Sequence, residues 1–80
     1  MDDWIVRYAA ALGLDDPTEI DGTAILALAR DVAHATERKN APLAAFVAGL
    51  YVAGRKAEGV SATDALTDAL VAAERLLGKH

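Results

Sequence analysis

The residues of this 80-residue sequence best suited to chemistry are two arginines, a histidine and an aspartate between positions 30 and 38. Arg30, His34 and Arg38 are spaced by four, so on a helix they would form a row along one face. Asp31 precedes His34 by three residues and could accept a hydrogen bond from its ring. Two guanidinium groups beside an imidazole could bind a phosphate or a carboxylate. The solvated face of an ordinary amphipathic helix would show the same spacing, so both interpretations stay open.

Other kinds of chemical site find little support in the sequence. Cysteine is absent, which excludes disulfides and thiol nucleophiles. Asp31 and His34 offer two metal ligands at most, without a HExxH motif, so neither a metal nor a cofactor is expected. Ser61 directly precedes a helical pattern and is better explained as an N-cap than as a nucleophile. We therefore predict that the chain has no catalytic residues and is not an enzyme.

The overall charge narrows the classes of partner. Twelve acidic and eight basic residues give a net charge of −4, whereas a surface that follows phosphates is normally basic. No apolar run reaches the roughly 18 residues that a membrane span requires, and the acidic N-terminus is unlike a secretory signal. These features predict a cytoplasmic protein that binds neither nucleic acid nor membranes.

Apolar residues recur at helical spacing along the whole chain, and no segment alternates as a strand does. The pattern predicts one all-α domain over residues 1–80, with helices at about 2–12, 22–39, 42–58 and 62–77. Asp21 or Thr23 could cap the second helix, and Pro17 suits a short helical piece in the connector before it. Short loops favour antiparallel neighbours, in either a four-helix bundle or an orthogonal helical array. Trp4 and Tyr8 are expected in the core, the alternative being exposed anchors for a partner.

The third predicted helix is unusual because the stretch NAPLAAFVAGLYVAG, residues 40–54, has no charged residue. A helix that is apolar all round must be covered on most sides. Either the other three helices surround it, or one side faces a second copy of the chain. Small residues spaced by four allow close helix crossings, and a glycine inside a helix needs a packing reason. We predict a homodimer with a crossing at Gly49, and self-association residues Ala45, Gly49, Val52 and Ala53.

The run ALARDVAHATERKNAPLAAFVAGLYVAG resembles the signature of a small helical family of unknown function from high-GC bacteria. The likeness rests on an Ala-Arg-Asp-x-Ala-His segment, a following Ala-Pro-Leu helix start and a glycine-containing third helix. Members of this family occur alone or behind domains similar to molybdenum-cofactor guanylyltransferases, which make molybdopterin guanine dinucleotide. The residues that match are Ala29, Arg30, Asp31, Ala33, His34, Ala41, Pro42 and Leu43.

The resemblance implies an accessory role in molybdenum-cofactor maturation, with a guanylyltransferase-like protein or a molybdoenzyme as partner. This sequence has no GTP-binding loop, so any transferase activity would belong to that partner. Our first interpretation is a non-catalytic, self-associating interaction module that docks a partner through Arg30, Asp31, His34 and Arg38. The alternative is a domain that binds or senses a small anion, such as a pterin or nucleotide phosphate, with the same residues.

Overall fold

The computed structural model describes residues 2–14 and 21–78. These residues form four helices and no strand, which confirms the predicted all-α fold. The short helical piece predicted at Pro17 lies outside the described residues. The helices are α1 (Asp3–Ala11), α2 (Gly22–Ala35), α3 (Asn40–Ala57) and α4 (Ala62–Leu76).

Three of the four helices begin at a residue whose side chain accepts a hydrogen bond from the first turn. Asp2 Oδ1 accepts from the Trp4 amide at 2.8 Å, and Asp21 Oδ1 accepts from the Ala24 amide at 3.0 Å. Ser61 Oγ accepts from the amide three residues later at 3.1 Å, as predicted for an N-cap. Each contact pairs an amide that the helix itself leaves without a partner. Local sequence therefore explains where α1, α2 and α4 start.

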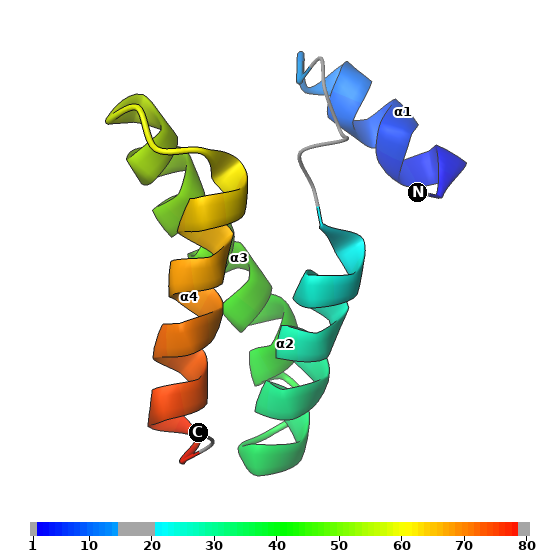
Figure 1. Ribbon diagram of the computed structural model, residues 1–80. Helices are drawn as coiled ribbons and strands as arrows, with labels where there is room; N and C mark the ends of the chain where they lie inside the picture. The colour runs from blue at the N-terminus through cyan, green and yellow to red at the C-terminus, as the bar shows by residue number, and fades with distance from the viewer. Residues whose placement is uncertain (1, 15–20, 79–80) are drawn as a thin grey trace.

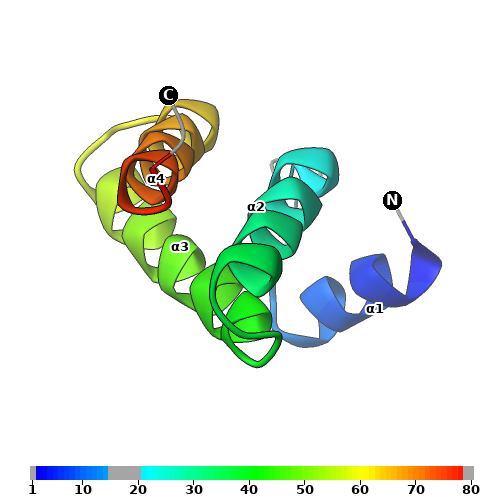
Figure 2. The ribbon, with the colours of Figure 1, turned by 90° about the horizontal axis from the view of Figure 1, so that it is seen from below.

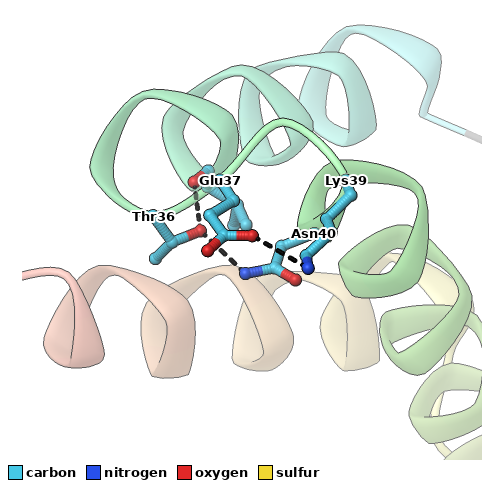
Figure 3. A network of polar contacts seen from close by, with 5 residues as sticks. Thr36, Glu37, Lys39 and Asn40 are labelled. Carbon is cyan, nitrogen blue, oxygen red and sulfur yellow. Dashed lines mark hydrogen bonds and ion pairs between the residues drawn. The ribbon is translucent and has the colours of Figure 1, made fainter.

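The predicted end of the second helix, near residue 39, is wrong, because α2 ends at Ala35. Thr36 donates through both its amide (2.9 Å) and its Oγ1 (2.7 Å) to the Val32 carbonyl. Asn40 Nδ2 in turn donates to Thr36 Oγ1 at 3.1 Å, so the two side chains join the ends of the turn (Figure 3). Side-chain bonds of this kind compete with helix continuation.

The same turn also moves the start of α3 from the predicted Pro42 back to Asn40. The Asn40 amide donates to the Glu37 carbonyl at 3.0 Å, and Lys39 pairs with the Glu37 carboxylate at 3.2 Å (Figure 3). Pro42 is the third residue of α3, where a missing amide hydrogen costs no helical bond. The chain therefore reverses direction within four residues.

The close helix pairs of the described chain are α2–α3, α3–α4 and, less extensively, α2–α4. These three helices run alternately down, up and down in Figure 1. Seen from below, α2 and α4 lie on one side of α3, and its other side has no helix against it (Figure 2). The alternative in which the other three helices surround the third is therefore wrong. We call α2, α3 and α4 together the three-helix body.

The core of the three-helix body consists of small and medium side chains. Leu28 of α2, Ala48 of α3 and the pair Ala65–Leu66 of α4 are buried. No large side chain in the described residues is completely enclosed. Because the α3 residue at this contact is an alanine, the backbones of its neighbours can approach closely. The hydrophobic stabilisation from this core is correspondingly modest.

Helix α1 lies apart from the three-helix body. It stands above the N-terminal end of α2 in Figure 1, and α2 lies between it and α4 in Figure 2. It forms none of the close helix pairs, and Ala9 is its only buried residue. Trp4 and Tyr8 are exposed by 59% and 52%, so the expectation that they lie in the core is wrong. Their rings stack on each other instead, with centroids 5.1 Å apart.

The surroundings of Gly49 lead to a first prediction. A Cβ added at Gly49 would have no atom within 4 Å, so nothing in the chain itself requires glycine there. Gly49→Ala is therefore expected to raise the free energy of unfolding by about 1 kcal/mol, the difference in helix propensity. Urea denaturation followed by circular dichroism at low protein concentration would measure the change.

Gly59 supplies the matched control for this prediction. Its φ of +92° lies in the region that disfavours side chains, so Gly59→Ala should lower the free energy of unfolding by about 1 kcal/mol. A loss of stability in Gly49→Ala would contradict the prediction and would indicate a close neighbour at Gly49.

Candidate functional site

The large apolar side chains of α3 lie on the side that faces away from α2 and α4. Phe46 is 67% exposed, and Leu43 and Leu50 are each 60% exposed. Val47 and Tyr51 are exposed beside them. At 100° per residue these positions fall within one sector of the helix. We call this surface the outer face of α3, made of Leu43, Phe46, Val47, Leu50 and Tyr51.

The inner side of α3 carries the small residues. Ala44, Ala45 and Val52 are half-buried around the buried Ala48. Of the residues predicted for self-association, Ala45 and Val52 thus lie on this inner side, whereas Gly49 and Ala53 are exposed. An ordinary amphipathic helix turns its large apolar residues inward, and α3 does the reverse. Because α3 has no polar side, the sequence predicted that part of its apolar surface would be left exposed by the chain itself. It did not predict which side of the helix that would be.

The total surface of the chain is large for its mass. The accessible area is 5895 Å² for a chain of 8.3 kDa. A compact monomer of that mass exposes about 4,600 Å², so the excess is about 1,300 Å². The radius of gyration is 13.0 Å, compared with about 11.6 Å for a compact 80-residue chain. Single exposed apolar residues are ordinary, but contiguous apolar patches mark interaction sites.

The charged row predicted on the second helix is only partly assembled. Arg30 and Asp31 of α2 form an ion pair with 3.4 Å between Nε and Oδ1. His34 is exposed one turn further along α2. Arg38 lies in the turn after Thr36, because α2 ends at Ala35, and so does not continue the helical row. The predicted site, with a guanidinium group on each side of the imidazole, therefore does not lie on one face of α2.

The hollow next to this row is lined mainly by apolar side chains. It has a volume of about 90 Å³ and lies between α2 and α4, beside Leu28 and Leu70. The charged residues that line it are Asp31 and Glu74, both of which are acidic. Two carboxylates oppose the approach of an anion. The geometry therefore gives more support to an apolar interaction surface than to an anion pocket.

The fold and the surface together define a small, all-α chain with an open apolar helix face. The chain belongs to a family described as a domain of unknown function, DUF6457, whose model matches residues 1–80. Comparison with curated proteins and with solved structures found no match. Within the part of the chain that the structure describes, no helix combines the length and the apolar character needed to cross a membrane.

Proposed function

We propose that the chain is a non-catalytic interaction module that self-associates through the outer face of α3. The observation that carries the proposal is the exposure of Leu43, Phe46 and Leu50 on a helix with no charged residue between Asn40 and Gly54. Removing such a surface from water is favourable by about 25 cal/mol for each Å² of apolar area. A second copy is a suitable occupant because its corresponding surface is equally apolar and uncharged.

The net charge supports the choice of this surface for self-association. Each copy has a net charge of −4, so two copies repel each other at long range. Contact is therefore favoured where charged side chains are absent, and the outer face of α3 meets this requirement. Gly49 and Ala53, which were predicted for self-association, are exposed beside it and belong to the proposed surface.

A link to molybdenum-cofactor maturation is a further part of the proposal. It is supported by the resemblance of the segment around Arg30 and His34 to family members fused behind guanylyltransferase-like domains. We propose that the exposed side chains of Arg30, His34 and Arg38, together with Asp31, dock such a partner and leave the outer face of α3 for self-association. Binding of a small anion by the same groups is the alternative, which the acidic residues Asp31 and Glu74 nearby disfavour.

Light scattering over a hundredfold range of concentration tests the self-association. The wild-type chain should have the mass of a dimer, and Leu50→Lys should have that of a monomer. A charge buried at the centre of the contact should weaken association at least 30-fold, roughly the effect of losing a hot spot of 2 kcal/mol. Ala72→Lys adds the same charge at an exposed position on α4 and should leave the mass unchanged.

A wild-type monomer at every concentration would contradict self-association. Thermal stabilisation by inorganic phosphate that is lost in Arg30→Ala would then favour the anion-binding alternative.

A further inference from the structure

Helix α1 is the second element of this chain that lacks a covering partner. It has nine residues, and isolated helices shorter than about 12–15 residues are marginal in water. A helix of this length is normally stabilised by packing its apolar side. In α1 that side remains exposed at Trp4, Tyr8 and Leu12, and only Ala9 is buried. Residues 2–14 and 21–78 therefore present two uncovered apolar helix faces, on α1 and on α3.

The two faces match in length and in chemistry. The stretch from Trp4 to Leu12 extends about 12 Å, and that from Leu43 to Leu50 about 10 Å, at 1.5 Å per residue. Both repeat at helical spacing, which allows the side chains of one helix to fit between those of the other. The stacked pair of Trp4 and Tyr8 offers the aromatic types that most often anchor interfaces.

The excess surface of the chain is enough for such a contact. Each partner in a standard interface contributes about 800 Å², which is less than the excess of about 1,300 Å² calculated above. If two chains covered the whole of this excess, they would bury about 2,600 Å², which is within the range of permanent homodimers. Covering the outer face of α3 alone would leave the apolar side of α1 in water.

We infer that α1 of one copy packs on the outer face of α3 of a second copy, and that the second copy returns the same contact. This inference rests on the proposed self-association and specifies what covers the apolar side of α1 and the outer face of α3. The occupant comes from a second copy because α1 forms none of the close helix pairs of its own chain, and α2 lies between it and α4 in Figure 2. Trp4 and Tyr8 would then lie against Phe46 and Leu50 of the other chain.

A complementation experiment tests this exchange. The double variant Trp4→Ala/Tyr8→Ala removes the anchors of α1, and Leu50→Lys disrupts the outer face of α3. Neither substitution touches the core of the three-helix body, so both variants should keep their helical circular dichroism. At a concentration at which the wild type is dimeric, each variant alone should be monomeric. An equimolar mixture should contain a mixed dimer, because intact α1 of the Leu50→Lys chain can bind the intact α3 of the other chain.

Three other outcomes would overturn the inference, and they separate it from the proposed function. If Trp4→Ala/Tyr8→Ala alone stays dimeric while Leu50→Lys does not, two α3 helices contact each other directly and the proposed function stands. If both variants and their mixture are monomeric while the wild type is dimeric, α1 does not cross to the other chain. A monomeric wild type would contradict the proposed function as well.

Trp4 provides an independent readout because it is the only tryptophan of the chain. Its fluorescence emission should shift to longer wavelength on dilution of the wild type, as the dimer separates and the ring becomes hydrated. Leu50→Lys should show the same long-wavelength emission at every concentration, although the substitution lies on another helix. Ala72→Lys should behave as the wild type. Emission that stays unchanged on dilution of a dimeric wild type below its dissociation constant would overturn the inference.

Discussion

Leu66→Ala is expected to lower the free energy of unfolding by about 3 kcal/mol, within the range measured for buried leucines. Leu66 is 8% exposed and belongs to the small core of the three-helix body. Truncation removes its apolar contacts and leaves a cavity that neighbouring alanines cannot fill. Domains of this size have a total stability on the order of 0.05–0.15 kcal/mol per residue, so the loss would be a large part of it. Urea denaturation followed by circular dichroism would measure it.

Leu76→Ala is the matched control for this change. It removes the same atoms from the same helix, but Leu76 is 89% exposed. Its free energy of unfolding should stay within about 0.5 kcal/mol of the wild type, as for other surface substitutions. A loss for Leu66→Ala no larger than that of this control would contradict the burial of Leu66. A large loss for Leu76→Ala would indicate instead that Leu76 is covered by a partner.

Ala65→Leu should be the second most disruptive substitution, with a loss of about 1–3 kcal/mol from overpacking. Ala65 is 0% exposed and belongs to the core of the three-helix body. A leucine there needs volume that only a displacement of α4 can provide, because protein interiors are closely packed. The change in the midpoint of thermal unfolding would show the effect.

Ala72→Leu adds the same side chain to an exposed position of α4 and should leave stability nearly unchanged. Both variants should be compared at one low concentration, because association raises the apparent stability of the folded state. A neutral Ala65→Leu would mean that the contact of α4 with its neighbours is looser than the structure shows.

The two uncovered faces of the chain show where sequence reasoning fell short. Trp4 and Tyr8 were expected in the core because large aromatic residues at helical spacing usually lie there. In the structure the only buried residue of their helix is Ala9. Periodicity identifies the apolar side of a helix, but it does not say whether that side contacts the same chain or another one. The choice depends on the positions of elements that are distant in sequence.

Four helices, and most of the residues at which they start and stop, can be predicted from the sequence. These features depend on contacts within one or two turns, such as the caps at Asp2, Asp21 and Ser61 and the positive-φ glycine at residue 59. The end of α2 at Ala35, four residues before the predicted end, is also explained by local hydrogen bonds. Thr36 bonds to the Val32 carbonyl and Asn40 bonds to Thr36, although the helical apolar pattern continues beyond Ala35.

The side of α3 that is buried depends on the packing of the helices and cannot be predicted from the sequence. That helix is apolar all round, so its pattern contained no preferred direction. Close approach of α2 and α4 favours the narrow side around Ala48, since small side chains let helices pack with their backbones near one another. Burial of the Ala48 side places the larger residues Leu43, Phe46 and Leu50 on the exposed side of α3. That exposed side is the surface that we propose for self-association.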